Sequence, residues 1–365
     1  MVPLARALVA RNHEVIFATR AEHVREAGFS HVVAGLSERE ARGPAAMKRR
    51  ELESIPVEAR RRLGFSRIFG LVHAPRRLPD LLGVLRSRPA DAIVYDSADL
   101  AAPIAAAALG LPSVNHSFGT MIPLSILEYA GELVEPLWRC QGLVPEPYAG
   151  AFGGLYLDIS PPSFAWEEPQ GVSARISPVM PPEPGEPPTW LEELGRPLVY
   201  ATLGTVFNEP ALLRRLLDGL DEVSAALVTT GRNVDPGSIG PVPEHIRVER
   251  FVPQAHVLPR CAAVVTHAGS GTTLGALAHG LPLLLVPQGA DQFDNAARCE
   301  RAGAAIVLRP DEVSPEAVRA GLRRLVEEPT FRSSAERIAA EIAAMPSPDE
   351  AAAAVEEYLV DASLG

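Results

Sequence analysis

The sequence predicts an α/β protein built from two doubly wound domains, and three observations carry this prediction. First, strand-like and helical runs alternate regularly through the second half of the chain, as they do in parallel β-α-β units. Second, six prolines lie between Pro178 and Pro188, and this stiff, surface-type segment separates the two halves. Third, 365 residues suffice for about two domains, each long enough to bury its own core.

These observations divide the chain into four parts. The strand-like runs of the second half are PLVYATLG, SAALVTTG, IRVERFV, AAVVTHAG, PLLLVPQ and AAIVL. A last helical run, DEAAAAVEEYLV, follows two further prolines. The predicted parts are a first domain over 1–177, a linker over 178–190, a second domain over 191–345 and a terminal helix over 346–365.

The bulk composition excludes several classes of function. The chain carries 34 basic and 45 acidic residues, and its net charge of −11 argues against nonspecific binding to nucleic acid or to anionic membranes. Cys140, Cys261 and Cys299 are widely spaced and form neither a disulfide framework nor a zinc pattern. A reducing cytoplasm is therefore the expected location. No apolar run approaches the ~20 residues of a membrane span.

The first half begins with a helix rather than with a strand. Val2, Leu4, Leu8 and Val9 lie near one helical face, and Glu14–Thr19 then has the pattern of a buried strand. In a doubly wound sheet such a helix follows a first strand, which is central in the strand order. The first domain is therefore predicted to be incomplete at its amino end, and we expect an upstream segment to supply that strand.

Further along the first half, residues 65–85 have a helical pattern, with Pro75 and Pro79 expected at its ends or at kinks. Residues 42–62 interleave Arg and Lys with Glu, which favours a solvated helical face over an anion-binding patch. Met121–Leu143 is predicted as a helix whose apolar residues suit either a pocket wall or the core.

Asp96 lies at the carboxyl end of a strand predicted at Asp91–Ser97, and two roles are open to it. It would cap the helix that starts near Leu100, which is a common use of aspartate. Alternatively it would face the sheet edge at which open α/β sheets bind ligands. His116 ends the next strand and could line a pocket at that edge, although a polar loop residue is the commoner explanation.

Residues 262–296 contain the most informative pattern of the chain. Ala262–Thr266 has the length and the β-branched content of a buried strand, and it ends at His267. Two glycines follow, and the next residues repeat at helical spacing up to Gly280. Leu283–Val286 then forms a second buried strand. The stretch therefore predicts a strand, a glycine turn, a helix and another strand.

The turn in this stretch is predicted to bind an anion. A helix amino terminus offers unpaired N–H groups and about half a positive charge, and glycine lets an anion approach the backbone. A purely structural turn would also need glycine, but here hydroxyl groups and an imidazole converge on it at a strand end. A phosphate or diphosphate fits best. The residues expected to face the anion are His267, Gly269, Ser270, Gly271, Thr272 and Thr273.

The motif HAGSGTT, followed by GLPLLLVPQGADQFDNA, resembles the donor-binding signature of nucleotide-sugar glycosyltransferases. It is most similar to the bacterial macrolide and antibiotic branch of glycosyltransferase family 1, and a weaker likeness extends over almost the whole chain. The resemblance implies the GT-B fold, with two facing Rossmann-like domains and a terminal helix that crosses back to the first. It also implies a UDP- or dTDP-sugar donor and a small apolar natural product as acceptor.

Further site residues are expected in neighbouring loops of the second half. Gly204 and Thr205 follow one strand end, and the resemblance implies that the loop containing Phe251 and Val252 reads the base. It also implies that Gln254 lies near the ribose, that Asp291 and Gln292 bind hydroxyls of the donor sugar, and that Asn295 is a further ribose candidate. From the residues alone, Asp291 could equally be a helix cap.

The catalytic residues are only partly present in this sequence. In the resembled family an aspartate after the corresponding strand orients a catalytic histidine, and Asp96 matches it better than Asp99. The position of that histidine lies upstream of Met1, together with the expected first strand. The resemblance implies inversion at the anomeric carbon. No Asp-x-Asp cluster marks a metal site, and neither a metal nor a cofactor is expected.

Two rival functions remain open from the sequence. A nucleotide-sugar epimerase or hydrolase of the same fold would need further acid or base groups facing the anomeric carbon, and none stands out besides Asp291. A degenerate donor-binding or auxiliary protein would bind the nucleotide without transferring a sugar. The sequence leaves the sugar, the acceptor and the oligomeric state undetermined, with a homodimer as one option.

Overall fold

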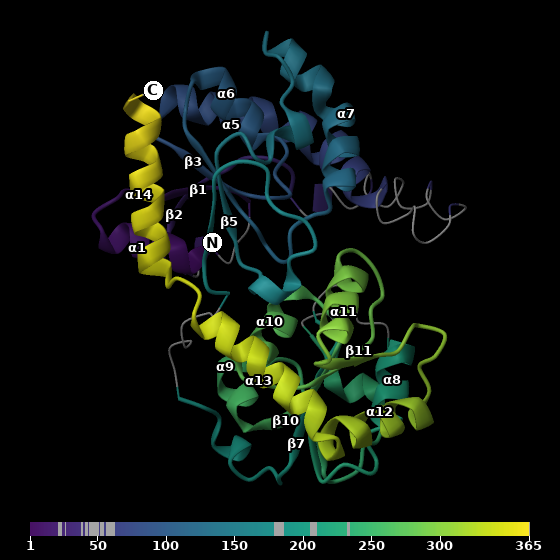
Figure 1. Cartoon of the computed structure of the whole chain (residues 1–365). Coiled ribbons are helices and arrows are strands. Elements are labelled where there is room, and N and C mark those ends of the chain that lie inside the picture. The colour runs from purple at the N-terminus through teal and green to yellow at the C-terminus, as the bar shows by residue number, and fades with distance from the viewer. Residues whose placement is uncertain are drawn as a thin grey trace. The chain divides into compact units, whose positions relative to one another are not determined.

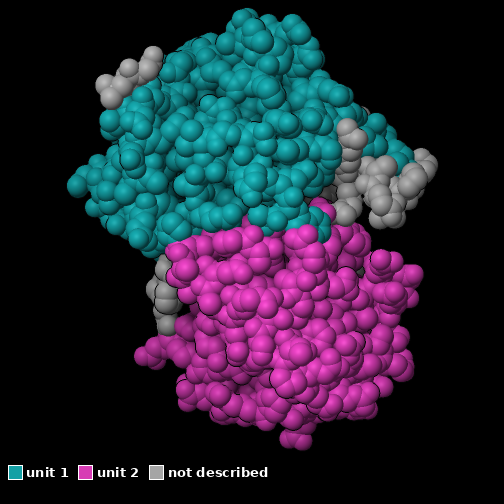
Figure 2. Space-filling view, viewed as in Figure 1, with its two compact units in different colours: residues 1–159, 165–177, 346–365 teal, residues 160–164, 178–345 magenta. Residues whose placement is uncertain are grey.

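The computed structural model divides into two compact units (Figures 1 and 2). Unit 1 comprises Met1–Ile159, Ala165–Ser177 and Pro346–Gly365, and unit 2 comprises Ser160–Phe164 and Pro178–Met345. The structure describes residues 1–20, 24–25, 27–37, 39–40, 43, 51, 55, 63–178, 186–204, 210–231 and 234–364. Thr205, most of the linker and most of the charged segment 42–62 lie outside the described residues.

Unit 2 is built on one parallel six-stranded sheet, in the order β12-β11-β10-β7-β8-β9. Its first strand, β7, therefore lies in the middle, and the strand order reverses between β7 and β10. This is the doubly wound order, which binds ligands at that reversal. The strands are β7 (Leu198–Thr202), β8 (Ala225–Thr229), β9 (Ile246–Glu249), β10 (Cys261–Thr266), β11 (Leu283–Leu285) and β12 (Ala305–Val307).

The strands at the centre of this sheet are buried because parallel sheets are covered by helices on both faces. This explains why β7 and β8 are continuous apolar runs rather than alternating ones. Ser314 caps α12 by accepting a hydrogen bond from the Ala317 N–H, and Pro315 occupies the first turn. The α-helices are α8 (Pro210–Asp218), α9 (Gln254–Val257), α10 (Ser270–Ala278), α11 (Gln292–Arg301), α12 (Pro315–Glu327) and α13 (Pro329–Ala343). The short 3-10 segments are η3 (Pro162–Phe164), η4 (Thr189–Leu191), η5 (Pro236–Ile239) and η6 (Leu258–Arg260).

Unit 1 contains two parallel sheets. One is the pair β1 and β2, and the other has four strands in the order β3-β4-β5-β6. Within the described residues, no ladder hydrogen bonds join the pair to the four strands. The strands are β1 (Ile16–Ala18), β2 (Ser30–Val32), β3 (Ile93–Asp96), β4 (Ser113–His116), β5 (Leu155–Asp158) and β6 (Ser173–Arg175).

The helices of unit 1 bury an apolar core around Trp138, Tyr95 and Ile104. The helix expected over 65–85 contains a π-helical part, η1, which continues into α5. Pro75 lies in the first turn of α5, and Pro79 lies inside that helix. The helical segments are α1 (Val2–Ala10), η1 (Ile68–His73), α5 (Ala74–Ser87), α6 (Ala102–Leu109), α7 (Leu124–Cys140), η2 (Pro147–Gly150) and α14 (Pro348–Leu364).

The last helix of the chain, α14, belongs to unit 1 and packs beside α1 (Figure 1). Leu4 and Leu8 from α1 share a buried cluster with Ala351, Ala352 and Val355 from α14. The segment after unit 2 therefore returns to complete the core of unit 1. In the described part of the chain, no helix is long and apolar enough to cross a membrane.

An ion cluster joins the polar sides of α1 and α14. Arg11 donates from Nε and Nη2 to Oε2 of Glu356, at 3.0 and 2.7 Å, and His13 Nε2 lies 2.8 Å from Oε1. The hydrogen bonds from Arg11, followed by that from His13, lower the pKa of Glu356 to about 2. A carboxylate with a lowered folded-state pKa stabilises the fold above its unfolded pKa and loses that effect as the pH falls.

Replacing Glu356 with glutamine is therefore expected to lower the Tm at neutral pH. The deficit should shrink as the pH falls from about 4.5 to about 2, because the wild-type carboxylate is protonated over that window. Thermal unfolding across this pH range measures the effect. Glu357, an exposed neighbour without a partner among the described residues, supplies the control Glu357→Gln. A deficit that stays constant with pH would contradict the assignment.

Candidate functional site

The loops after β7 and β10 meet at the carboxyl edge of the unit 2 sheet. β7 and β10 are hydrogen-bonded neighbours, and Thr202 pairs with Thr266 at their carboxyl ends. Gly204 therefore follows β7 close to where His267 follows β10. This is the point of strand-order reversal, where a doubly wound sheet leaves a crevice for a ligand.

The imidazole of His267 is packed between two glycines. A methyl group built on Gly269 would lie 2.5 Å from His267 Nε2, and one built on Gly204 would lie 2.6 Å from Cε1. Gly204 also has φ +73, which glycine adopts without strain. Gly269 has an ordinary φ of −65, so at this position space rather than backbone conformation requires glycine. The two glycines thus fix the ring beside the start of α10.

Burial lowers the pKa of the His267 imidazole, and the charge of Asp291 and a hydrogen bond with the Thr202 backbone oppose this effect. The ring is therefore neutral at pH 7 and carries a single N–H group, which the hydrogen bond with the Thr202 backbone uses in this structure. A neutral ring also avoids the cost of burying an unpaired charge.

Ala268, between His267 and Gly269, has the left-handed backbone that glycine usually supplies. Its φ is +65 and its side chain is fully buried. Such a conformation costs about 1–2 kcal/mol for a residue with a Cβ, so neighbouring contacts must hold it in place. One such contact comes from Asn295, whose Nδ2 donates to the Ala268 carbonyl at 2.9 Å. The sequence analysis did not predict this strained conformation at Ala268.

The amino terminus of α10 is open to a ligand. Gly269 is its N-cap and supplies no side-chain hydrogen bond, and the first helical bond runs from the Thr273 N–H to the Gly269 carbonyl. The N–H groups of Ser270, Gly271 and Thr272 therefore have no partner within the helix. Gly271 is exposed, and nothing lies within 4 Å of its Cβ position. The predicted anion-binding residues are thus brought together as expected.

A buried network supports this helix start. Asp291 is the N-cap of α11, but its side chain does not cap that helix. Instead, Oδ2 accepts hydrogen bonds from Ser270 Oγ and from Asn295 Nδ2, both at 2.9 Å. Asn295 Nδ2 also lies 3.0 Å from Ser270 Oγ. Within the described residues, Asp291 Oδ1 has no hydrogen-bond partner, and it is the oxygen left for a ligand.

Two residues predicted to contact the donor have buried side chains that make hydrogen bonds within the protein. Asn295 is 2% exposed, and Ala268, Ser270 and Asp291 take up its amide hydrogens. Gln292 is also 2% exposed, and its Oε1 accepts from the N–H groups of Gln288 and Gly289. Its amide nitrogen has no partner in the described part of the chain.

The loop after β9 presents an aromatic face and an amide near α10. Phe251 is 56% exposed, whereas Val252 is buried. Gln254 opens α9 and donates from Nε2 to Thr272 Oγ1 at 3.0 Å, which ties this loop to the first turn of α10. Thr273 is 1% exposed, and its hydroxyl has no partner among the described residues.

In unit 1, the structure separates the roles of two aspartates. The N–H groups of Ala101 and Ala102 donate to Asp99 Oδ1, so Asp99 rather than Asp96 supports the turn that leads into α6. Asp96 Oδ1 accepts from the Ala98 N–H at 2.8 Å, while Oδ2 has no partner among the described residues. Burial raises the pKa of Asp96, and a carboxyl oxygen remains free at the end of β3.

His116 pairs with Asp96 in the register of β3 and β4, so both residues end at the same sheet edge. Burial lowers the pKa of His116 to about 4, so the ring is neutral at pH 7. Its Nδ1 lies 2.6 Å from the Ser117 carbonyl and donates to it. The proton is thereby placed on Nδ1, and Nε2 is left as an acceptor.

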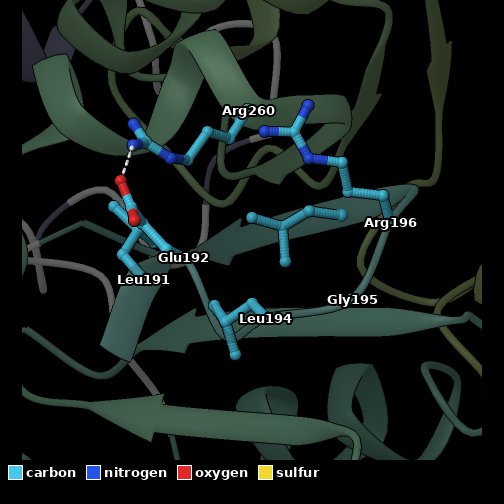
Figure 3. Close-up of a pocket in the computed structure, with 7 residues that line it drawn as sticks. Leu191, Glu192, Leu194, Gly195, Arg196 and Arg260 are labelled. Carbon is cyan, nitrogen blue, oxygen red and sulfur yellow. Dashed lines mark ion pairs between the residues drawn. The ribbon is translucent and has the colours of Figure 1, made fainter. Parts of the chain in front are cut away.

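A separate pocket of about 150 Å³ lies at the opposite, amino-terminal edge of the unit 2 sheet (Figure 3). Arg260 pairs there with Glu192 at 3.6 Å and donates to the His256 carbonyl at 3.0 Å. Because β7 and β10 begin at this edge, the pocket is distinct from the site at α10. Its lining residues are Leu191, Glu192, Leu194, Gly195, Arg196, Leu198 and Arg260.

The strand order of unit 2 and the open start of α10 are features of the doubly wound class of domain, many of whose members bind nucleotides. Residues 214–358 match the family described as "Erythromycin biosynthesis protein CIII-like, C-terminal domain". The whole chain is 31% identical to 4'-demethylrebeccamycin synthase of Lentzea aerocolonigenes, over 94% of this chain and 92% of that protein. It is 31% identical to L-demethylnoviosyl transferase of Streptomyces niveus, over 95% of this chain and 91% of that protein.

Solved structures agree with these relatives. The glycosyltransferase VinC in complex with dTDP is 26% identical, with a TM-score of 0.81 over 100% of this chain and 96% of that chain. The spinosyn rhamnosyltransferase SpnG complexed with thymidine diphosphate is 26% identical, with a TM-score of 0.79 over 98% of this chain and 95% of that chain. The chain belongs to the antibiotic glycosyltransferase family, and it is a glycosyltransferase with the GT-B fold, as the sequence predicted.

Proposed function

We propose that this glycosyltransferase binds a UDP- or dTDP-sugar at the carboxyl edge of the unit 2 sheet and transfers the sugar to a hydroxyl of a small apolar natural product. The start of α10 carries the proposal, because its unpaired N–H groups converge there with the imidazole of His267. The structures of VinC with dTDP and of SpnG with a spinosyn aglycone support the two substrate classes.

The residues of unit 2 divide among the parts of the donor. The diphosphate lies against the N–H groups of Ser270, Gly271 and Thr272. On binding, the single imidazole N–H of His267 exchanges its hydrogen bond with the Thr202 backbone for one with the diphosphate. Phe251, which is exposed, stacks on the base, and Val252 contributes backbone groups beneath it. The remaining proposed contacts are Gly204, Thr205 and Thr273 with the phosphates, Gln254 with the ribose, and Asp291 and Gln292 with the sugar.

The proposed reaction is a single displacement with inversion. The acceptor oxygen bonds to the anomeric carbon while the bond from that carbon to the diphosphate oxygen breaks, and the electron pair leaves with the diphosphate. A general base takes the proton of the acceptor hydroxyl. The N–H groups of α10 and the neutral His267 stabilise the charge that develops on the leaving group. The scheme assigns that charge to these donors rather than to a metal ion.

We propose that Asp96 orients the general base through its free Oδ2. A buried carboxylate beside a base holds it in one tautomer and stabilises the charge that the base gains. The base itself is not assigned to any residue of this sequence. We place the enzyme in the cytoplasm, and the three free cysteines, of which Cys140 is exposed, suit a reducing compartment.

Saturating dTDP or UDP is expected to raise the Tm of the wild-type protein by about 5–10 °C, because a ligand at 100 times its Kd stabilises the folded state by ~2.7 kcal/mol. His267→Ala should remove most of this rise, since it deletes the imidazole donor. His279→Ala is the matched control, because His279 lies at the opposite end of α10 and should leave the rise intact. Differential scanning fluorimetry measures all three proteins.

Transfer to a panel of aglycones then separates the proposed function from its rivals. A new glycoside together with released nucleoside diphosphate supports a transferase. An epimeric donor formed without acceptor supports an epimerase, and nucleotide binding without any turnover supports a donor-binding protein. A Tm unaffected by either nucleotide would remove the donor site from the proposal.

A further inference from the structure

The buried side-chain amide of Asn295 makes three hydrogen bonds near the proposed donor site. It lies one turn into α11, is 2% exposed, and directs Nδ2 toward the start of α10. Its amide hydrogens are shared among the Ala268 carbonyl, Ser270 Oγ and Asp291 Oδ2, at 2.9, 3.0 and 2.9 Å. These acceptors come from two loops that follow different strands, so one side chain joins both loops.

The first consequence concerns the turn between β10 and α10. Ala268 is held at φ +65, a backbone conformation that is costly for any residue with a Cβ. The same turn aims the His267 ring and the first N–H groups of α10. Without the hydrogen bond from Asn295, Ala268 would be expected to relax toward negative φ. The His267 ring and the first N–H groups of α10 would then no longer point toward the same ligand position.

The second consequence concerns Asp291. Asn295 Nδ2 and Ser270 Oγ both donate to Oδ2, which fixes the carboxylate plane and leaves Oδ1 for a ligand. Two hydrogen bonds to one oxygen of a charged group stabilise one side-chain orientation. The contact between Asn295 and Asp291 also spans one turn of α11, a spacing at which side chains on a helix meet.

We infer that Asn295 is a positioning residue of the donor site: it holds the left-handed turn at Ala268 and the carboxylate of Asp291 in the arrangement that binds the nucleotide sugar, without touching the donor. This inference depends on the proposed function, because it concerns the same site. The amide hydrogens of Asn295 are directed to Ala268, Ser270 and Asp291, and the side chain is 2% exposed, so the hydrogen bonds that it donates lie within the protein.

Asn295→Ala tests the inference, with dTDP as the probe and isothermal titration calorimetry as the measurement. The Kd should rise about 30-fold, because hydrogen bonds that fix two groups of the site are lost. Adding Ala268→Gly should restore affinity about tenfold, since glycine adopts positive φ without strain. Ala268→Gly alone should change the Kd less than about threefold, and it is the matched control.

Asn295→Asp provides a second, pH-dependent readout. It places a carboxyl group beside Asp291, and such a pair shares a proton as the pH falls. The protonated form can donate one hydrogen bond in place of the lost amide. The ratio of Kd values, Asn295→Asp over Asn295→Ala, should therefore fall toward low pH. His267 and dTDP titrate with both variants, so their effects cancel in this ratio.

The outcomes separate this inference from the proposed function. Failure of the wild-type protein to bind dTDP would remove the donor site itself. Wild-type binding that Asn295→Ala leaves unchanged would overturn the positioning role. A loss that Ala268→Gly does not restore, with a flat pH ratio for Asn295→Asp, would mean that Asn295 contacts the ligand directly. If Asn295→Ala fails to fold, the pH ratio is taken against Ala268→Gly instead, and the same fall toward low pH is required.

Discussion

Replacing Gly269 with alanine is expected to raise the Kd for dTDP at least ~100-fold while unit 2 stays folded. The new methyl group would lie 2.5 Å from His267 Nε2 and 2.9 Å from Cε1, which forces the imidazole out of its place between two glycines. A 100-fold loss corresponds to ~2.7 kcal/mol and falls within the usual cost of overpacking, ~1–3 kcal/mol. Gly269 has φ −65, so alanine meets no backbone penalty there. Calorimetry with dTDP measures the loss.

Gly275→Ala is the matched control for this substitution. Gly275 lies in the same helix, and a methyl group there would meet Leu258 Cδ1 at 3.5 Å, an ordinary contact. Its affinity for dTDP should equal that of the wild type, and circular dichroism should show that both variants are folded. Undiminished binding by Gly269→Ala would mean that the position of His267 does not matter for the diphosphate.

The strand, turn, helix and strand over residues 262–296 could be predicted because each depends on local pattern. Apolar runs of strand length flank a glycine turn, and the structure confirms β10, α10 and β11 in that order. The doubly wound order of unit 2 also agrees with the predicted alternation of strands and helices. Local periodicity was therefore sufficient to predict most of the fold of unit 2.

What the sequence could not predict are contacts between residues that are distant along the chain. Gly269 was expected to give an anion access to the backbone, whereas the structure shows that it also makes room for His267. The sequence does not indicate that Gly204 lies on the other side of the same ring, because that contact arises only when β7 and β10 pair. Alanine rarely adopts a positive φ, so nothing in the sequence indicates the conformation of Ala268.

Two other differences had signals that could have been used. Asp291 and Asn295 are four residues apart on a helix, and this spacing brings side chains together. It could have indicated the contact between Asn295 and Asp291 that the structure shows. Likewise, Asp99 stands closer than Asp96 to the start of α6 at Ala102, and its carboxylate accepts from the Ala102 N–H group.

Gly154→Ala is expected to destabilise unit 1 by about 3 kcal/mol or more, a large effect for a single methyl group. The added carbon would lie 2.0 Å from the carbonyl oxygen of Ser113 and 2.7 Å from its hydroxyl. A backbone oxygen cannot rotate away as a flexible side chain can. Because Ser113 begins β4 and Leu155 begins β5, the clash falls where these two strands start to pair.

Hydrogen exchange measured by mass spectrometry can place this loss within the molecule. Peptides from β4 and β5 should lose protection in Gly154→Ala, while β7 and β8 of unit 2 keep theirs, because the two units have separate cores. Gly83→Ala is the control, since Gly83 is exposed in α5 and has open space at its Cβ position. It should be neutral or stabilising by up to ~1 kcal/mol. Unchanged protection of β4 and β5 would show that the strands accommodate the methyl group. The close packing of Gly154 against Ser113 would then not be required for the stability of this sheet.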